Sequence, residues 1–367
     1  MARKSAVASC HPLDRACACF DAAWAAEQRG ELRDARAQID AAIALFRRHA
    51  GREHPDLAHA LIVRARVAGD RQDHLAAIRD GRRALAMLAG PRRELEVVRL
   101  RAFAASTLGA ALLARGRYAE AEAVYRPVLS DCRRRLGARA PEVATLANNL
   151  AVIYKYTGRF GRAAQLYRHA LALIREHAGP DHVEVATVLH NLGGLMHAAG
   201  RYREAEPYAR EAAELRARAL GEDHLDVAAD RAALAAILEE LGRLDEAEQI
   251  YRDVLARFER AYGPEHYELC INLNNLAALE HRRGRLEQAE DRYRRALALK
   301  RRLLGREHPD VAMTLNNLAA LQADRGRRRE AASLYRQALR IFSRSLAPRH
   351  PKLVQCRANL AALGSIN

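Results

Sequence analysis

The chain is poor in aromatic residues, lysine and cysteine. Aromatic residues make up 5% of its 367 residues, with a single tryptophan, and only four of the 61 lysine and arginine residues are lysines. No run of about 18 uncharged apolar residues occurs, so we expect no membrane-spanning segment. Three of the six cysteines are scattered one per repeat on apolar helix faces, which is typical of a reducing compartment and predicts a cytoplasmic protein.

Signatures of catalysis and of cofactor binding are also missing. The sequence contains no Gly-Lys pair that could form a phosphate-binding loop, no GxSxG nucleophile motif and no two histidines at positions i and i+4. Cys10, His11, Cys17 and Cys19 form a cluster of metal-ligand residue types, but their spacing matches no familiar zinc pattern. We therefore expect a non-enzymatic protein with no cofactor and no metal.

What the chain does contain is a repeat. Six glycines, each followed by arginine, stand 42 residues apart: Gly116, Gly158, Gly200, Gly242, Gly284 and Gly326. A fixed period of this length is typical of a solenoid, in which each helical unit buries its apolar face only against the next unit. Function is therefore expected on a continuous surface to which several repeats contribute.

Each repeat is predicted to form two helices joined at its glycine. In the copy around Gly326, the first helix is expected to begin at Pro309, because proline suits a first helical position. Apolar residues, among them Leu315 and Leu318, then recur at steps of three and four, and Gly326 permits the positive φ that ends a helix. A second apolar stripe between 331 and 342 predicts the second helix.

These repeats resemble the tetratricopeptide repeat, in the 42-residue form found in kinesin light chains and nephrocystin-like proteins. Three motifs carry the resemblance: NNLA at 148–151, 274–277 and 316–319, a Gly-Arg turn with Glu-Ala-Glu at 116–122 and 242–248, and YRxAL or YRxVL at 125–129, 167–171, 251–255, 293–297 and 335–339. The resemblance covers nearly the whole chain. It implies an all-α, right-handed superhelix of about eight helix-turn-helix repeats with a C-terminal capping helix.

The period also gives domain boundaries. We expect a flexible N-terminus at 1–13, two degenerate repeats at 14–93, six regular repeats at 94–347 and the capping helix at 348–367. Gln72 stands where a repeat glycine would be expected, and Gly30 lies 42 residues before it. The step from Gln72 to Gly116 is 44 residues, which predicts a two-residue insertion near 90–96.

Several recurrent residues are expected to be structural. One histidine precedes the first helix in each later repeat, where it can cap that helix: His182, His224, His266, His308 and His350. The tyrosines of the YRxAL and YRxVL segments occupy a packing position and are expected in the core. The arginines directly after these tyrosines either form ion pairs with the glutamates of the Gly-Arg turns or line a basic stripe.

The resemblance further implies a peptide-binding groove on the concave face of the first helices. In that family the asparagine before the leucine of NNLA commonly bonds the backbone of a bound peptide, and an amide side chain can both donate and accept. The candidate peptide-binding residues are Asn148, Asn149, Lys155, His190, Asn191, His197, Asn274, Asn275, His281, Arg282, Asn316, Asn317 and Asn359. Ala233 interrupts this track. The alternative is that the asparagines only tie adjacent helices together.

The charge of the chain suggests the kind of partner. The formal net charge is +16, and an extended acidic peptide segment of another protein is the ligand that such a groove would attract. The predicted function is a protein-interaction scaffold or adaptor. A regulatory or signal-sensing module is an alternative, and nucleic-acid binding by a basic superhelix is a less favoured one. A homodimer contact through the terminal helix also stays open.

Overall fold

The structure, a computed structural model, describes residues 11–51, 54–90, 94–348 and 350–364. Within these ranges it contains 17 α-helices and no strand, which confirms the predicted all-α fold with eight helix pairs and one further helix. The chain divides into two compact units, 1–149 and 150–367, and each is described by itself. Helix α7, Pro141–Tyr156, crosses the division. The predicted boundaries at 93 and 347 stay predictions.

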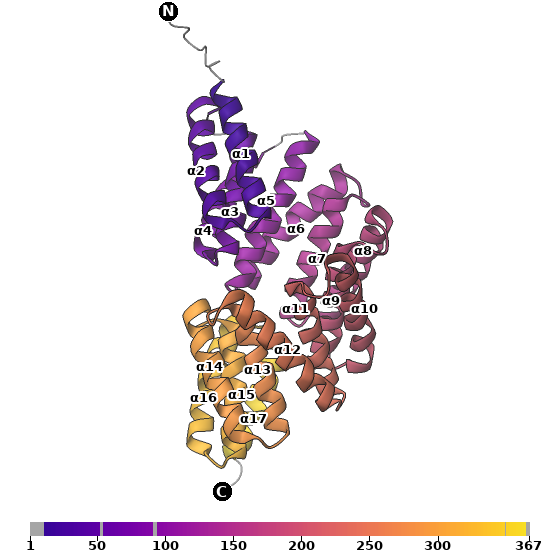
Figure 1. The fold of residues 1–367 in the computed structure, drawn as a ribbon, viewed down its shortest axis with the longest axis vertical. Coiled ribbons are helices and arrows are strands. Elements are labelled where there is room, and N and C mark those ends of the chain that lie inside the picture. Colours follow the sequence, from indigo (N-terminus) through magenta and orange to yellow (C-terminus); the bar gives the residue numbers. More distant parts are fainter. Residues whose placement is uncertain (1–10, 52–53, 91–93, 349, 365–367) are drawn as a thin grey trace, which may run out of the picture. The chain divides into compact units, whose positions relative to one another are not determined.

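Unit 1 is built from three helix pairs and the first part of α7 (Figure 1). The pairs are α1 Pro12–Gln28 with α2 Leu32–His49, α3 Pro55–Asp70 with α4 His74–Met87, and α5 Leu95–Ala114 with α6 Tyr118–Arg135. The first helix of each pair is called the A helix and the second the B helix. The predicted flexible N-terminus and insertion fall partly on 1–10 and 91–93, which lie outside the described residues.

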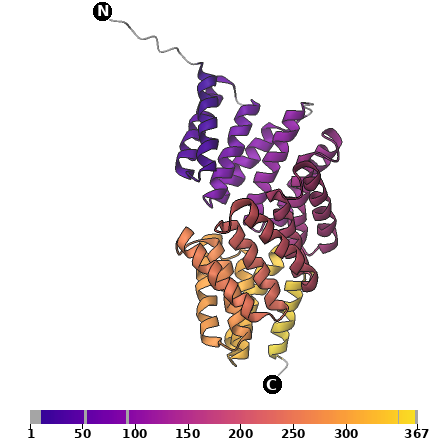
Figure 2. The same cartoon turned by 45° about the vertical axis from the view of Figure 1, so that its right-hand side comes forward.

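Unit 2 continues the same alternation, as Figures 1 and 2 show from two sides. Its elements are the rest of α7 with α8 Phe160–Ala178, α9 Val183–Ala198 with α10 Tyr202–Leu220, α11 Leu225–Glu240 with α12 Leu244–Tyr262, α13 Tyr267–Arg282 with α14 Leu286–Leu304, α15 Pro309–Asp324 with α16 Arg328–Ser345, and the single helix α17 Pro351–Gly364. Odd-numbered helices are thus A helices and even-numbered helices are B helices.

The turns between A and B helices have the backbone geometry that the glycine period predicts. Gly116 and Gly326 have φ of 68° and 76°, in the left-handed region that glycine adopts without steric cost. Gln72, at the position of a missing glycine, has φ of 61° and is the one non-glycine residue with positive φ in the described chain. The register of the degenerate second repeat is therefore confirmed by its backbone.

The recurrent histidines cap the A helices, as predicted. In each case Nδ1 accepts a hydrogen bond from the backbone N–H two residues further on, at 3.1–3.3 Å: His182, His224, His266, His308 and His350. His54 does the same in the second repeat, at 3.3 Å. The bond satisfies one of the free N–H groups at a helix start, so these side chains are committed to structure.

The tyrosines of the repeat lie in the core. Tyr125, Tyr167, Tyr251, Tyr293 and Tyr335 are all buried, with at most 3% of each exposed. They pack among the alanines and leucines of both helices and are not available to stack on nucleic-acid bases. The prediction that these rings are core residues is confirmed.

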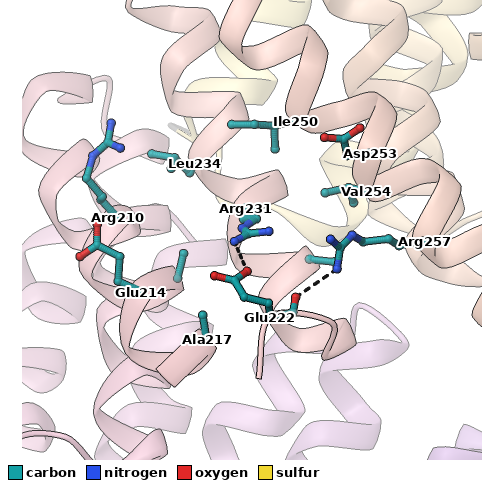
Figure 3. A pocket seen from close by; sticks show the side chains of 12 residues that line it. Arg210, Glu214, Ala217, Glu222, Arg231, Leu234, Ile250, Asp253, Val254 and Arg257 are labelled. Atoms are coloured by element: carbon teal, nitrogen blue, oxygen red, sulfur yellow. Dashed lines mark hydrogen bonds and ion pairs between the residues drawn. The ribbon is translucent and has the colours of Figure 1, made fainter. Parts of the chain in front are cut away.

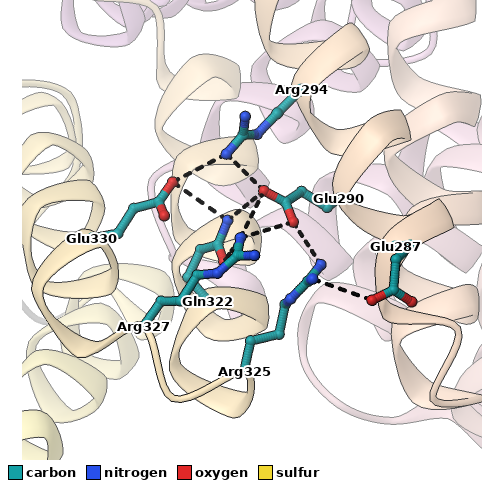
Figure 4. Close-up of polar contacts among 7 residues, drawn as sticks. All are labelled: Glu287, Glu290, Arg294, Gln322, Arg325, Arg327 and Glu330. Atoms are coloured by element: carbon teal, nitrogen blue, oxygen red, sulfur yellow. Dashed lines mark hydrogen bonds and ion pairs between the residues drawn. The ribbon is translucent and has the colours of Figure 1, made fainter.

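Arginine and glutamate join neighbouring repeats along the turns (Figure 4). The arginine of one Gly-Arg turn reaches the last glutamate of the preceding turn motif, 37 residues earlier, in three successive repeats: Arg243 to Glu206 at 2.8 Å, Arg285 to Glu248 at 2.9 Å and Arg327 to Glu290 at 3.1 Å. We call this series the arginine ladder. Arg294 also contacts Glu290, four residues earlier on the same helix, at 2.6 Å. These arginines are neutralised within the fold.

Helix α5 bears on the expectation that no segment spans a membrane. By length and composition it is long and apolar enough to span a bilayer, although 61% of its apolar window is buried inside the fold. Burial of this kind is usual for a core helix, and one such helix is weak evidence of a membrane span. Arg99 and Arg101 interrupt the uncharged run, and the expectation stays a prediction.

Candidate functional site

The second asparagine position of the A helices is half-buried in every repeat where it occurs. This holds for Asn149, Asn191, Asn275, Asn317 and Asn359. Asn275 forms no hydrogen bond with the part of the chain that the structure describes, and Asn317 accepts one long bond from Asn316, at 3.4 Å. Side chains of this exposure can reach a ligand, which agrees with the predicted track along the A helices.

At two of the first positions of the track, 190 and 274, the side chain bonds the next A helix instead. Nδ1 of His190 lies 2.7 Å from the carboxylate of Asp230 on α11. Asp230 is also held by Nε of Arg216 on α10, at 2.7 Å, and only 3% of Asp230 is exposed. His190 is therefore part of a buried ionic tie between repeats.

The same arrangement recurs two repeats later with different residues. Asn274 is buried and accepts a hydrogen bond from the Thr314 hydroxyl on α15, at 3.0 Å. Thr314 in turn accepts one from the ammonium group of Lys300 on α14, also at 3.0 Å. At 190 and 274 these contacts support the interpretation that the side chains tie helices together, against the interpretation that they line the groove.

Three further predicted asparagines also form hydrogen bonds within the chain, and one of these bonds joins two A helices. In unit 1, Asn148 donates to Asn149 at 3.2 Å, and Asn149 donates to the Ser106 hydroxyl on α5 at 3.4 Å. In unit 2, Asn359 accepts a hydrogen bond from Gln355 at 2.7 Å. The 148 and 149 pair closes unit 1, whereas the positions from Asn191 onward belong to unit 2.

His281 and Arg282, at the end of α13, are engaged by carboxylates. His281 Nε2 lies 2.7 Å from Asp324, and Arg282 lies 3.7 Å from Glu239 and 3.5 Å from Glu240. Burial raises the pKa of Glu239 to about 7, although the charge of Arg282 opposes this rise. The positive charge predicted at this point of the groove is thus largely compensated by the acidic end of α11.

Lys155 and His197, by contrast, lie together among positive charges. The Lys155 ammonium lies 3.4 Å from the point that a Cβ of Gly194 on α9 would occupy, so a missing side chain makes room for it. Burial and the nearby charge of Lys352 lower the pKa of Lys155 to about 8. Burial, with both lysines, lowers the pKa of His197 to about 4, so this imidazole is neutral at physiological pH.

Lys352 on α17 is a member of this cluster that the site prediction missed. Burial and the charge of Lys300 lower its pKa, and Asp310 opposes the shift. Lys352 is thus coupled by charge to two of the other three lysines, Lys155 and Lys300, in a protein whose other basic residues are almost all arginines. That rarity was a usable sequence signal. We call Lys155, Lys352 and His197 the lysine cluster.

The lysine cluster forms because the turn after α7 reaches the start of α17. His350 Cδ2 lies 3.3 Å from the position of a Cβ on Gly158, and the His350 side chain hydrogen-bonds the backbone of Tyr156. Burial and Lys352 lower the pKa of His350 to about 4, so its ring is neutral while it makes both this bond and its helix cap. The predicted capping helix thus also lines the candidate site.

A pocket in unit 2 arises where two neighbouring repeats depart from the pattern of the others (Figure 3). Its volume is about 290 Å³, and it lies between α10, α11 and α12. Ala213 stands where 255 and 297 are leucine, Arg231 where 273 is leucine, and Arg257 where 215 and 299 are leucine. Arg231 pairs with Glu222, and Arg257 bonds the Glu222 carbonyl at 3.0 Å. Both arginines are thus engaged by the turn that precedes α11.

The described residues contain no group of three or more His, Cys, Asp or Glu side chains that could hold a metal ion. Of the N-terminal cluster considered in the sequence, Cys10 lies outside the described residues, and Cys17 and Cys19 are free thiols. Cys132, Cys270 and Cys356 are free as well, and all three are buried.

Comparison with known proteins identifies the repeat. The tetratricopeptide repeat model matches in overlapping copies that together cover residues 100–363, and a second model of the same repeat matches residues 21–56. The chain belongs to the tetratricopeptide repeat family, as its motifs predict. No curated protein sequence matches it.

Solved structures share the fold at low sequence identity. A Rap protein complexed with competence and sporulation factor is 14% identical, with a TM-score of 0.62 over 96% of this chain and 98% of that one. The apo form of RapI is 16% identical, with a TM-score of 0.61 over 78% of this chain and 97% of that one. A putative kinesin light chain of Podosopora anserina with nearly identical repeats is 22% identical over 56% and 97%, with a TM-score of 0.42.

Proposed function

We propose that this protein is a non-enzymatic peptide-binding adaptor that holds an extended acidic segment of another protein against the A helices of unit 2. The observation that carries the proposal is the lysine cluster. Lys155 forms no ion pair with the described chain, and burial, together with the charge of Lys352, lowers its pKa. Two ammonium groups that repel each other at one place favour an anionic ligand, because its charge would relieve that repulsion.

The half-buried asparagines supply the second component of the proposed site. Asn191, Asn275 and Asn317 stand at the same repeat position of α9, α13 and α15, and Ala233 of α11 interrupts the series. Each can bond the backbone of an extended segment for about 0.5–1.5 kcal/mol, so the affinity would come from several such bonds together with the charged contact. The asparagines would hydrogen-bond the backbone of the bound peptide, whereas the lysine cluster would select its acidic side chains.

A regulatory role is the second form of the same proposal. One similar structure is a Rap protein complexed with competence and sporulation factor, and another is a Rap conjugation gene regulator in complex with the Phr* peptide. These complexes support a peptide as the ligand of a fold of this kind. An adaptor and a regulator would bind in the same way and would differ in the effect that binding has on the partner.

Nucleic-acid binding is less favoured, because many of the arginines that could contact phosphates are engaged. Arg126, Arg210, Arg252 and Arg294 each pair with the glutamate four residues earlier, and the arginine ladder engages the turns. A high positive charge that is paired within the fold releases few counterions from a nucleic acid.

The test is capture of partners from a lysate with and without nuclease, followed by fluorescence anisotropy with an acidic peptide and its Gln/Asn counterpart. We expect nuclease-resistant protein partners, and tighter binding of the acidic peptide that Lys155→Met weakens. Arg295→Met on the B helix α14 is the matched control, since it removes an exposed cation that pairs with Glu259. Nuclease-sensitive recovery, or equal binding of both peptides, would refute the proposal.

A further inference from the structure

Unit 1 contains a pocket that none of the predicted site residues lines. It has a volume of about 410 Å³ and lies between α3, α4 and α5. Its apolar lining consists of Ala65, Ala77, Ala110, Ala111, Ala114 and the ring of Phe103. Ser106 and Thr107 also line it, and they stand one 42-residue period before Asn148 and Asn149. The pocket therefore lies on the same face of the A helices as the asparagine track.

Two charged residues line this pocket, and one of them is already engaged. The Arg66 guanidinium bonds both carboxylate oxygens of Glu27 and lies 4.2 Å from the centroid of the Trp24 ring. It also lies 5.3 Å from the centroid of Phe103. Ion pairing and stacking on two aromatic rings fix this cation in place. Arg66 is therefore not available to an anionic ligand.

Asp70 is the charged group that remains. It is exposed at the end of α3, lines the pocket and forms no ion pair or hydrogen bond with the described chain. Partial burial of its carboxylate and the charge of Glu27 raise its pKa, and the charge of Arg66 opposes this rise. An unpaired carboxylate at the edge of an apolar pocket, near a second carboxylate, attracts a cation.

We propose that this pocket binds the side chain of a lysine or arginine from a partner protein, with its cationic head on Asp70 and its methylene chain along the alanines. The two parts of such a side chain match the two parts of the pocket. A purely apolar side chain would further desolvate Asp70 without compensation, and an acidic one would be repelled by Asp70 and Glu27. The site is separate from the lysine cluster of unit 2 and selects the opposite charge.

The carboxylate of Asp70 can be removed without unfolding the chain. Its side chain is exposed and forms no ion pair or hydrogen bond with the described chain, so Asp70→Asn removes no contact that holds the fold together. Loss of binding in this variant would therefore reflect the ligand contact. Ala110 is exposed at the pocket, so Ala110→Leu can fill the space while Asp70 stays, and Ala110→Ser is its size-matched control.

The experiment is an NMR titration of the full chain with labelled alanine methyl groups, using n-butylammonium as the probe and n-butanol as its neutral control. We expect saturable shifts at Ala77, Ala111 and Ala114 with n-butylammonium, at least about tenfold weaker in Asp70→Asn, absent in Ala110→Leu and retained in Ala110→Ser. Absence of saturable shifts, equal binding of n-butanol, or unchanged binding in Asp70→Asn would overturn the proposal.

Discussion

The ring of Tyr125 on α6 occupies the space that a Cβ on Gly109 of α5 would need. The Tyr125 hydroxyl donates a hydrogen bond to the Ser106 carbonyl at 3.3 Å, which holds the ring against the helix at this point. Later repeats have Ala151, Ala277 and Ala319 at the position of Gly109. The glycine thus permits a closer approach of tyrosine to the A helix in this repeat than in those.

Gly109→Ala should therefore destabilise unit 1. The added methyl group forces Tyr125 from its buried position, and overpacking of this kind costs about 1–3 kcal/mol. The measurement is urea denaturation followed by circular dichroism. Gly161→Ala in α8 is the control, because nothing lies within 4 Å of its added Cβ, and alanine should stabilise that helix by up to about 1 kcal/mol. Equal effects of the two substitutions would contradict the packing argument.

Glu290→Gln should weaken the stacking of the last repeats. Glu290 is 13% exposed and accepts hydrogen bonds from Gln322 at 2.9 Å and Arg325 at 2.6 Å. Removing its charge weakens contacts to three arginines at once and leaves the largely buried Arg325 only the exposed Glu287 as an acidic partner, at a cost of about 1–3 kcal/mol. Glu287→Gln is the control, since that side chain is 83% exposed and its ion pair should contribute less than about 1 kcal/mol.

The pH dependence of stability gives an independent check on Glu290. Burial favours the neutral acid, but the hydrogen bond from Gln322 and the charges of Arg294, Arg327 and Arg325 outweigh it and lower the pKa. The stabilisation is complete above the unfolded pKa of about 4.3 and is lost as the pH falls through the lower folded pKa. The stability of Glu290→Gln should therefore fall less steeply with decreasing pH than that of the wild type. Identical acid-unfolding curves of the two proteins would contradict a lowered pKa of Glu290.

Neighbouring asparagines should give opposite results. Asn274→Ala removes the hydrogen bond between repeats and leaves the Thr314 hydroxyl only the Asp310 carbonyl of its own helix, at 3.3 Å. It should lower the free energy of unfolding by about 0.5–1.5 kcal/mol, with little effect on peptide affinity. Asn275→Ala should leave stability unchanged and weaken binding of an acidic peptide by about two- to tenfold. Thermal unfolding and fluorescence anisotropy separate the two effects. A large loss of stability in Asn275→Ala would show that this residue also ties helices together.

Binding of an acidic peptide should weaken as the pH rises between about 7 and 9, because Lys155, with a pKa of about 8, loses its charge there. Arginine stays charged across this range, so Lys155→Arg should remove that part of the pH dependence. The measurement is the dissociation constant as a function of pH for both proteins. The same slope in both would mean that Lys155 does not contact the ligand charge.

Features that depend on neighbouring residues were predictable from the sequence. The glycine at each turn, the histidine caps and the buried tyrosines follow from helix chemistry within one 42-residue period, and even Gln72 was placed correctly. The half-buried asparagine position follows in the same way from helix geometry. In each case the residue and its partner lie within one or two helices.

Features that depend on distant parts of the chain were not predictable. Nothing near Lys352 in the sequence indicates that α17 lies beside Lys155, because that proximity depends on the curvature of several stacked repeats. The contact between His190 and Asp230 was missed for a related reason. In the sequence, position 190 looks equivalent to position 191 on the same A helix. Only the packing of the next repeat against this helix distinguishes the two positions. For the lysine cluster, the small number of lysines among the basic residues was the available sequence signal.

The contact between Gly158 and His350 has a consequence for how this protein can change in length. Every bond of the arginine ladder joins a repeat to its neighbour, so a 42-residue segment could be inserted or deleted without altering the type of those bonds. The contact at Gly158 spans the repeats from α8 to α16, and an insertion or deletion would separate its partners. Unit 2 therefore tolerates substitution within its repeats far better than a change in their number.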